Sequence, residues 1–300
     1  MQADLGVLYR DEDLLVVDKP AGIAVHRGWA HDREFALTLA RRLAGRHVYP
    51  VHRLDRGTSG ALLLALTPEI ASRLAAGFET GRVHKRYLAL VRGVPPESGV
   101  IEHPLPRSPG GPRVSAVTEF RRLGTFERYA LLEVVPLTGR LHQIRRHLKH
   151  LSHPLIGDVR YGKGEHNRLF RSRFGLHRLA LHAFELAFEH PRRGVPLRVR
   201  APLPEDLAGP LRAMGLTPQV SPPVPVLVGA ACPGDPQGMK QALRCGGGGL
   251  LEASIGSPPA TPRSPSRLSE AAGSRPGGAG GEGDAPSPGA RTNSISRHDR

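Results

Sequence analysis

The chain has 300 residues, of which 39% are hydrophobic and 23% charged, as in ordinary globular proteins. Lys and Arg number 42 against 27 Asp and Glu, so the formal net charge is +15, which favours a polyanionic partner such as nucleic acid. No apolar run reaches the length of about 18 residues that a membrane-spanning helix needs, so such a helix is excluded.

Hydrophobic periodicity alternates between strand-like and helix-like spacing over residues 1–217. In chain order it predicts strands at 5–9 and 14–19, a helix at 33–43, a strand at 61–66, a helix at 68–78, and strands at 87–91, 117–122, 129–135, 179–188 and 197–200. Gly45 and Gly81 mark the ends of the two helices, and Pro68 opens the second. We therefore expect an α+β fold whose central sheet is mixed and largely antiparallel, with flanking helices.

The composition changes near residue 218. From there to residue 300, 38 of 83 positions are Gly, Pro or Ser, and such a segment cannot offset the entropy lost on ordering. We predict a folded domain at 1–217 and a disordered tail at 218–300. The folded part holds 34 Lys and Arg against 21 Asp and Glu, a net charge of +13. Both cysteines, Cys232 and Cys245, lie in the tail, and a pair is too few for a disulfide framework, so a cytoplasmic setting fits.

The segment 51–60, Val-His-Arg-Leu-Asp-Arg-Gly-Thr-Ser-Gly, places one carboxylate, Asp55, between Arg53 and Arg56. Neighbouring guanidinium groups favour an ionised carboxylate even in a partly closed cleft. The glycines of this segment permit unusual backbone conformations or the close approach of a ligand. An ionised carboxylate on a rigid loop is suited to act as a nucleophile or a base. The alternative is a surface turn held by an Asp–Arg ion pair.

The segment 138–148, Thr-Gly-Arg-Leu-His-Gln-Ile-Arg-Arg-His-Leu, carries Arg140, Arg145 and Arg146. As a helix it would turn its leucine and isoleucine side chains inward and its arginines toward a cleft or solvent. The alternative is an amphipathic helix whose basic face is simply solvated.

Histidines are dense in the same region, at His142, His147, His150 and His153. Few of them share a helix face, and no Asp or Glu joins them at the spacing of a metal site. We therefore predict no metal.

Lys85, Arg86 and Tyr87 place an aromatic ring beside two cations at the start of a predicted strand. The ring is suited to stack on a base while the cations meet phosphate. The alternative is a half-buried strand tyrosine. Trp29, the only tryptophan, is either a core anchor or a stacking residue.

Taken together, these blocks resemble the RluA-type family of pseudouridine synthases, in family order from about residue 5 to residue 215. The matching stretches are Leu-Val-Val-Asp-Lys-Pro-Ala-Gly at 15–22, His-Arg-Leu-Asp with Thr-Ser-Gly at 52–60, Lys-Arg-Tyr at 85–87, Gly-Arg-x-His-Gln-Ile-Arg at 139–145, His-Pro-Leu-Ile-Gly-Asp at 153–158 and Leu-His-Ala at 181–183. Shorter stretches at 25–29, 145–148 and 167–168 are similar to the branch of the family that modifies uridine 65 of transfer RNA.

The resemblance implies the pseudouridine synthase fold and the cofactor-free isomerisation of a uridine within folded RNA. It implies that Asp55 is the catalytic aspartate, acting on the ribose or the base. Tyr87 would stack on the extruded uracil and help to remove the C5 proton, and Arg145 would pair with the Asp55 carboxylate. Arg53 would help to displace the target nucleotide.

The expected partner is RNA, with transfer RNA first, and the expected protein is a cytoplasmic monomer without metal, small-molecule cofactor or membrane contact. The predicted RNA-binding residues are Arg53, Arg56, Lys85, Arg86, Arg140 and Arg146. Extrusion of a stacked base requires a stacking ring, and phosphate contacts account for the charge of the folded part. Alternatives are a ribosomal-RNA pseudouridine synthase of the same family and a non-catalytic RNA-binding protein. A hydrolase that uses Asp55 with His52 ranks last, because no Ser or Cys nucleophile lies in an elbow-like context.

Overall fold

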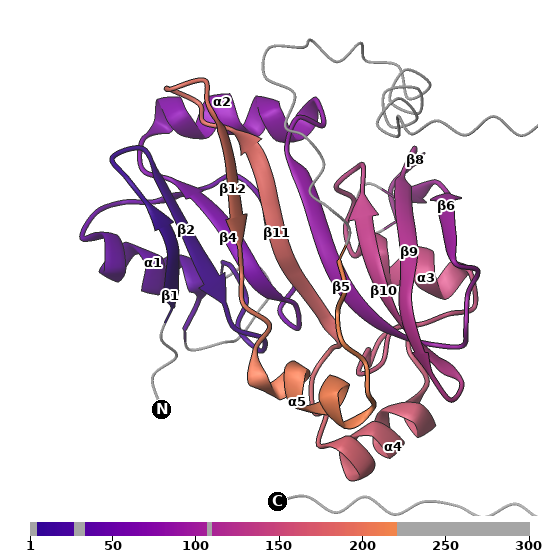
Figure 1. Ribbon diagram of the computed structural model, residues 1–300. Coiled ribbons are helices and arrows are strands. Elements are labelled where there is room, and N and C mark those ends of the chain that lie inside the picture. Colours follow the sequence, from indigo (N-terminus) through magenta and orange to yellow (C-terminus); the bar gives the residue numbers. More distant parts are fainter. Residues whose placement is uncertain (1–4, 27–33, 107–109, 221–300) are drawn as a thin grey trace, which may run out of the picture. The chain divides into compact units, whose positions relative to one another are not determined.

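The computed structural model describes residues 5–26, 34–106 and 110–220 (Figure 1). The helices are α1 (Ala36–Ala44), α2 (Pro68–Glu79), α3 (Gln143–His150), α4 (Gly164–Phe174) and α5 (Glu205–Ala213). The strands are β1 (Gly6–Arg10), β2 (Leu14–Lys19), β3 (Tyr49–Pro50), β4 (Ser59–Ala65), β5 (His84–Arg92), β6 (Ser98–Glu102), β7 (Leu105–Pro106), β8 (Arg113–Val114), β9 (Val117–Phe126), β10 (Tyr129–Pro136), β11 (Leu181–Glu189) and β12 (Pro196–Arg200). Within these ranges no helix has the length and hydropathy required to cross a membrane.

One large sheet organises the chain. Its strand order is β1-β2-β4-β11-β5-β10-β9-β6, with β12 paired to β11 and β3 paired to β4, while β7 and β8 form a separate hairpin. The pairing of β4 with β11 is parallel, and the other strand pairs are antiparallel. The expected α+β fold with a mixed, largely antiparallel sheet is therefore confirmed.

The junction between β4 and β11 requires a glycine. The two strands pair only through His182 with Ser59 and Ala183 with Gly60. Gly60 has a φ of +114°, and a Cβ atom there would overlap the carbonyl oxygen of Ala183. Because β4 follows directly on the segment that contains Asp55, this close approach fixes that segment against the centre of the sheet.

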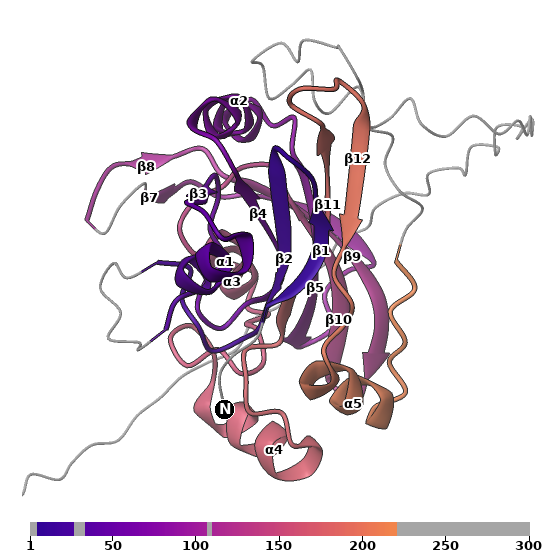
Figure 2. The same cartoon turned by 90° about the vertical axis from the view of Figure 1, so that its left-hand side faces the viewer.

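Three groups of buried apolar side chains hold the helices against the sheet. Ala40 of α1 and Leu148 of α3 belong to the first group, and Ile70 of α2 belongs to the second. Phe170 of α4 and Leu211 of α5 belong to the third. Figures 1 and 2 show α2 at one end of the sheet and α4 with α5 at the other. The cavity described below lies on the face of the sheet against which α1 and α3 pack.

Each predicted strand has a counterpart, with bounds moved by a few residues. The first predicted helix begins at Ala36 and ends at Ala44, and its C-cap Gly45 adopts the left-handed conformation. The second begins at Pro68 behind the N-cap Thr67, whose hydroxyl accepts a hydrogen bond from the Ile70 amide.

The segment 138–148 differs from expectation, because its helix begins only at Gln143. His142 has a φ of 53°, which breaks the helical path before that residue. The helices α4 and α5 were not predicted. Neither carries a side-chain N-cap, and Pro210 lies inside α5, so the usual start signal is missing, although Gly175 caps the C-terminus of α4 in the left-handed conformation. Trp29 and residues 221–300 lie outside the described residues, so their predicted features stay predictions.

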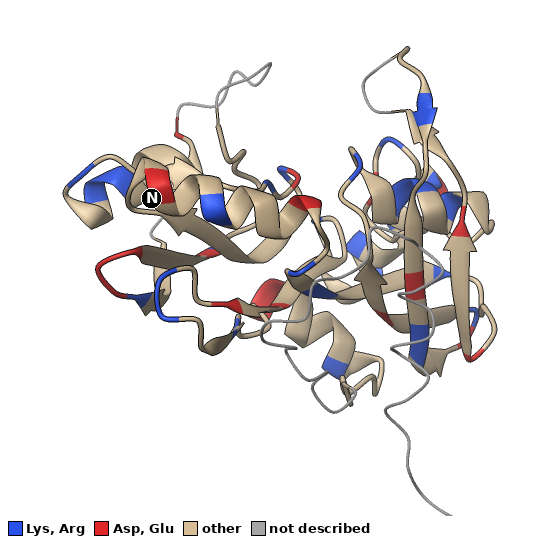
Figure 3. Cartoon of the chain, turned by 90° about the horizontal axis from the view of Figure 1, so that it is seen from above, with Lys and Arg blue, Asp and Glu red and all other residues tan. Residues whose placement is uncertain are grey.

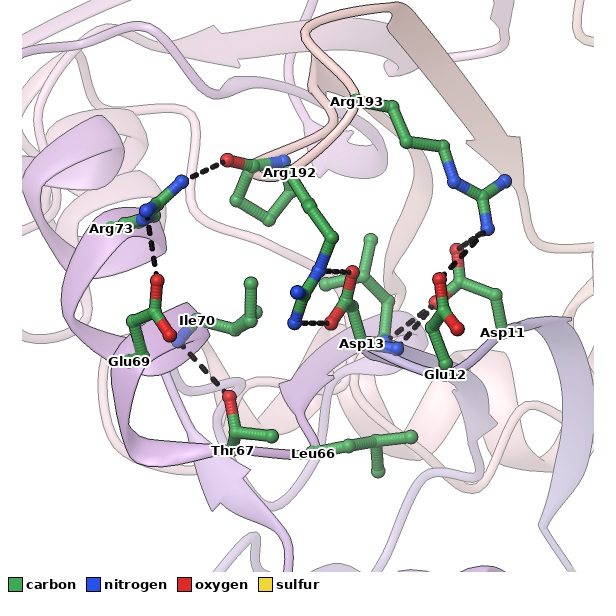
Figure 4. A network of polar contacts seen from close by, with 12 residues as sticks. Asp11, Glu12, Asp13, Leu66, Thr67, Glu69, Ile70, Arg73, Arg192 and Arg193 are labelled. Carbon is green, nitrogen blue, oxygen red and sulfur yellow. Dashed lines mark hydrogen bonds and ion pairs between the residues drawn. The ribbon is translucent and has the colours of Figure 1, made fainter.

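An ion-pair network ties the turn between β1 and β2 to the turn between β11 and β12 (Figure 4). Arg192 donates two hydrogen bonds of 2.7 Å to the buried carboxylate of Asp13. Arg193 lies 3.6 Å from Asp11, and Arg73 of α2 donates to the carbonyl oxygen of Pro191. The hydrogen bonds from Arg192 hold the pKa of Asp13 below its usual value. Three segments distant in sequence are thereby joined at this end of the sheet.

We expect the substitution Asp13→Asn to lower the melting temperature at pH 7 by about 2 to 4 °C, because it removes a charge-assisted contact from a buried carboxyl. Since the folded state lowers the pKa of Asp13, the contact stabilises the protein above the ordinary pKa of about 4 and is lost as the pH falls below it. The difference in melting temperature between the native protein and Asp13→Asn should therefore be smaller at pH 3 than at pH 7. An equal difference at both values would contradict this assignment.

Candidate active site

A cavity of about 490 Å³ opens on the face of the sheet that carries α3. Phe78, Glu79 and Leu181 also line it, but most of the lining comes from three segments that are far apart in sequence. They are the His-Arg-Leu-Asp loop at 52–55, Lys85 and Tyr87 of β5, and residues 136–145 leading into α3. The fold thus brings together the three blocks that sequence analysis singled out.

Asp55 and Arg145 form an ion pair in this cavity. Nη1 of Arg145 donates a hydrogen bond of 2.9 Å to Oδ2 of Asp55. The same guanidinium donates from Nε and Nη2 to both carboxylate oxygens of Asp158, at 2.8 and 2.9 Å. Burial opposes the charged form of Arg145, but its hydrogen bonds to Asp158 and Asp55 outweigh this and raise its pKa. One permanently positive group therefore fixes the Asp55 carboxylate, whose side chain keeps 16% exposure toward the cavity.

Asp158, Tyr161 and His142 complete this arrangement, and sequence analysis gave none of them a role. The guanidinium carbon of Arg145 lies 5.1 Å from the centre of the Tyr161 ring, and the Tyr161 hydroxyl is 3.1 Å from Nδ1 of His142. Nε2 of His142 is 3.7 Å from Asp55, and burial lowers the pKa of this imidazole while Asp55 acts in the opposite sense. The matching stretch at 153–158 ends in Asp158, which was the available signal, but spacing alone cannot show that its turn folds back over α3.

The backbone around Asp55 is held by Lys19, which is fully buried at the end of β2. Its Nζ donates to the carbonyl oxygens of Pro20 and Ile23, each at 2.8 Å, and is 3.4 Å from the carbonyl oxygen of Arg56. Burial lowers the pKa of Lys19 to about 7, with Arg178 adding to the effect. The Asp-Lys-Pro stretch therefore positions the residue that follows Asp55.

His52 anchors the other end of the same loop. Its Nε2 accepts a hydrogen bond of 2.9 Å from the Leu63 amide, and its ring stacks on Phe78 with centroids 4.8 Å apart. Burial lowers the pKa of His52 to about 3, so the ring is neutral and able to accept this bond at physiological pH. His52 is thus a positioning residue rather than a base for a hydrolase.

Gln143 joins the start of α3 to the sheet. Its side-chain oxygen accepts from the Arg140 amide at 3.0 Å and from the Thr138 hydroxyl at 2.7 Å. Its side-chain nitrogen donates to the carbonyl oxygen of Val117 and to the hydroxyl of Thr118, each at 2.9 Å. These four bonds fix the first turn of the helix that carries Arg145.

Tyr87 lines the cavity with its ring nearly buried, at 8% exposure. Burial and the nearby Asp55 carboxylate both raise the pKa of its hydroxyl, so it is a neutral phenol at physiological pH. Lys85, two residues earlier, also faces the cavity, and burial lowers its pKa to about 8.

The predicted RNA-binding residues fall at different places. Arg53 and Arg140 line the cavity beside Lys85, whereas Arg56 is exposed on the loop and Arg146 lies on α3 outside the cavity lining.

The prediction for Arg86 is wrong. Side chains alternate along a strand, so the orientation of Tyr87 toward the cavity turns Arg86 to the opposite face. There it is 3% exposed and donates hydrogen bonds to Glu133 at 2.6 Å and Glu185 at 3.0 Å. A cation so enclosed offers no surface to a phosphate.

The histidines that suggested a metal have other partners. His147 bonds the Thr118 hydroxyl and the carbonyl oxygen of His103, each at 2.9 Å, and His153 lies 3.1 Å from the carbonyl oxygen of Arg92. In the described part of the chain, no group of three His, Cys, Asp or Glu side chains is placed to hold a metal ion.

Comparison with known proteins identifies the class. Residues 13–150 match the family model described as RNA pseudouridylate synthase. The human protein RNA pseudouridylate synthase domain containing 4 superposes with a TM-score of 0.59 at 30% identity, over 71% of this chain and 94% of that one. Human RNA pseudouridylate synthase domain containing 1 gives 0.57 at 26% identity, over 82% and 98%.

Curated relatives match this chain at higher sequence identity than these solved structures do. The chain is 43% identical to tRNA pseudouridine synthase C of Vibrio cholerae over 234 residues, which cover 70% of this chain and 96% of the relative. It is 41% identical to the protein of the same name from Salmonella typhimurium over 235 residues, covering 70% and 90%. The chain therefore belongs to the RluA-type RNA pseudouridine synthases, and it is an isomerase.

We expect Asp158→Asn to lower the rate of pseudouridine formation by about 10- to 100-fold, because Arg145 loses the carboxylate that orients it toward Asp55. RNA affinity should change little, since Asp158 is buried away from the surface. The measurement is the single-turnover release of tritium from RNA labelled at uracil C5. Asp206→Asn is a matched control, because this exposed aspartate pairs with Arg178 instead. Equal rates for the two variants would contradict the role given to Asp158.

Proposed function

We propose that this chain converts uridine 65 of transfer RNA to pseudouridine, with Asp55 as the catalytic aspartate and without a cofactor. The observation that carries the proposal is the Asp55 carboxylate, which faces the cavity while Arg145 holds it at 2.9 Å. The name of the curated relatives, tRNA pseudouridine synthase C, supports transfer RNA as the substrate. The short stretches at 25–29, 145–148 and 167–168 support the position within it.

The reaction begins with extrusion of the uridine, because a base inside a stacked helix is out of reach of a side chain. The cavity is a concave space of about 490 Å³, within the range of small-ligand sites, and it receives the nucleoside. The ring of Tyr87 stacks on the uracil. Arg53 is exposed and lines the cavity, and in this proposal it helps to displace the nucleotide from the RNA helix.

Asp55 then acts on the extruded nucleotide, at the ribose or at the base. The N-glycosidic bond breaks, the uracil rotates within the cavity, and a bond forms between its C5 and the ribose. The C5 proton leaves to solvent and N1 takes one from solvent, so the reaction is an isomerisation that requires no oxidant or reductant. Because burial and Asp55 raise the pKa of Tyr87, its hydroxyl takes part as a neutral phenol and not as a phenolate.

Basic side chains around the cavity hold the RNA. Arg53, Lys85 and Arg140 line the cavity, and Arg56 and Arg146 lie beyond it, so that phosphates on either side of the target nucleotide meet positive charge. The proposal assigns catalysis to residues 1–217, acting as a cytoplasmic monomer.

We expect Asp55→Asn to reduce turnover by at least about 10³-fold, because the amide is neither a nucleophile nor a base. Affinity for an unmodified transfer RNA transcript should stay within about threefold of the native protein. Tritium release and fluorescence anisotropy measure the two quantities on the same transcript. Native turnover by this variant would refute the role of Asp55, and loss of RNA binding together with turnover would indicate a structural aspartate.

A separate experiment tests which RNA and which uridine are modified. We expect tritium release from a transfer RNA transcript to disappear when uridine 65 is replaced by cytidine, and ribosomal RNA to give no release. Tritium release from ribosomal RNA alone would support the proposed reaction and contradict transfer RNA as the substrate. If neither RNA releases tritium and both bind tightly, the protein is a non-catalytic RNA-binding protein.

A further inference from the structure

A second group of basic side chains lies outside the active-site cavity, between α3 and the β7–β8 hairpin. Its members are His103, Arg113, Arg146 and His150, here called the His103–His150 cluster. The two histidine rings stack, with centroids 3.8 Å apart and 16° between their planes. Arg113 is exposed on β8, and His150 is exposed at the end of α3. Figure 3 shows Lys and Arg on both of these elements.

Hydrogen bonds hold the cluster in one arrangement. Nη2 of Arg113 donates to Nε2 of His103 at 2.8 Å, and its Nε donates to the carbonyl oxygen of Pro104 at 3.1 Å. A guanidinium has no acceptor, so His103 contributes a lone pair at Nε2, and the proton of the neutral ring is at Nδ1. The carbonyl oxygen of His103 bonds the buried imidazole of His147, which fixes this residue to α3.

The cluster is short of negative charge. The charged groups that act on His103 are His150 and Arg146 from α3 and Arg113 from β8, and all of them are basic. Together with burial they lower the pKa of His103. Glu102, the carboxylate next in sequence, is exposed at the end of β6. Among the residues that the structure describes, neither Arg113 nor Arg146 forms an ion pair with a carboxylate.

The cluster continues a basic path that starts at the cavity. Arg140 lines the cavity, and its Nε donates to the carbonyl oxygen of Ser115, immediately after β8. The helix α3 starts at the cavity with Gln143 and carries Arg146 and His150 away from it. At about 1.5 Å per residue, His150 lies about 10 Å along the helix from Gln143. The cluster therefore lies within reach of an RNA whose target nucleotide occupies the cavity.

We propose that the His103–His150 cluster binds a backbone phosphate of the RNA substrate, that Arg113 turns from Nε2 of His103 to the phosphate, and that His103 takes up a proton from solvent at the nitrogen so released. The proposal rests on the proposed function only for the identity of the RNA. Without an anion, the neighbouring cations disfavour a charged imidazole. A bound phosphate reverses that balance, because opposite charge within a few ångströms favours the protonated ring. The site thus couples RNA affinity to pH.

The sign of the coupling follows from linkage. The protonated histidine is favoured in the RNA complex relative to the free protein, so the complex binds more protons. Affinity must therefore rise as the pH falls through the pKa of the histidine in the complex, which the phosphate raises above the ordinary value near 6.5, and become independent of pH well above that pKa. One proton taken up gives at most about a tenfold change in affinity per pH unit.

The test is the affinity for a transfer RNA transcript between pH 8 and pH 6, measured by fluorescence anisotropy at fixed ionic strength. We expect the native protein to bind about 3- to 10-fold more tightly at pH 6 than at pH 8. The double variant His103→Gln/His150→Gln should lose most of this dependence, since glutamine still accepts a bond from Arg113 but does not titrate. His177→Gln removes an exposed histidine after α4 and is the matched control, with native behaviour expected.

A second variant tests the phosphate contact without titration. We expect Arg113→Gln to reduce the slope of log affinity against log salt concentration by about one, the change for one lost phosphate contact. Circular dichroism confirms that each variant is folded.

Equal pH dependence in the native protein and the double variant, or an unchanged salt slope for Arg113→Gln, overturns the proposal. Tritium release, run in parallel, separates this result from the proposed function. Absence of turnover with pH-dependent binding intact would refute the catalytic proposal and still support the phosphate site.

Discussion

The active site depends on how one guanidinium is shared between two carboxylates. Arg145 meets both oxygens of Asp158 with a pair of hydrogen bonds and reaches Asp55 with its remaining nitrogen. The planar fork of arginine has the donors for this arrangement, and a lysine ammonium would act only as a point charge. Since Asp158 is buried and Asp55 faces the cavity, the inner carboxylate orients the cation, and the cation fixes the outer carboxylate.

The rest of the fold brings the three side chains of this contact together. Asp55 precedes β4, Arg145 lies on α3, and Asp158 lies in the turn before α4. Asp55 is 90 residues from Arg145, and Asp158 is 13 residues from it. Lys19 and His52 fix the loop of Asp55, and Gln143 fixes the helix of Arg145. These three residues stand in the motifs of the family but do not face the chemistry as acids or bases. Much of what the motifs specify is therefore positioning.

The central strands could be predicted from the sequence because short apolar runs mark them, whereas the edge strands β3 and β6 could not. Asp55 between two arginines and Tyr87 beside two cations stand out by their composition, and both line the cavity, although their roles stay predictions. Prediction from sequence failed where the answer depends on tertiary contacts. Arg86 looked like a phosphate ligand because sequence does not show which face of β5 meets Glu133 and Glu185. The role of Asp158 depends on a turn that brings it back to α3. Neither α4 nor α5 begins with a side-chain N-cap, which is the signal that most often marks the start of a helix.

The most direct test of this account is the single-turnover rate of tritium release by Arg145→Lys, compared with the native protein on the same transfer RNA transcript. Lysine keeps the positive charge and removes the fork that reaches both carboxylates. We expect the native protein to release tritium and the variant to do so at least about 10²-fold more slowly, with RNA affinity unchanged. A variant that reacts at the native rate would show that charge alone suffices, and that the shared guanidinium is not what the site depends on.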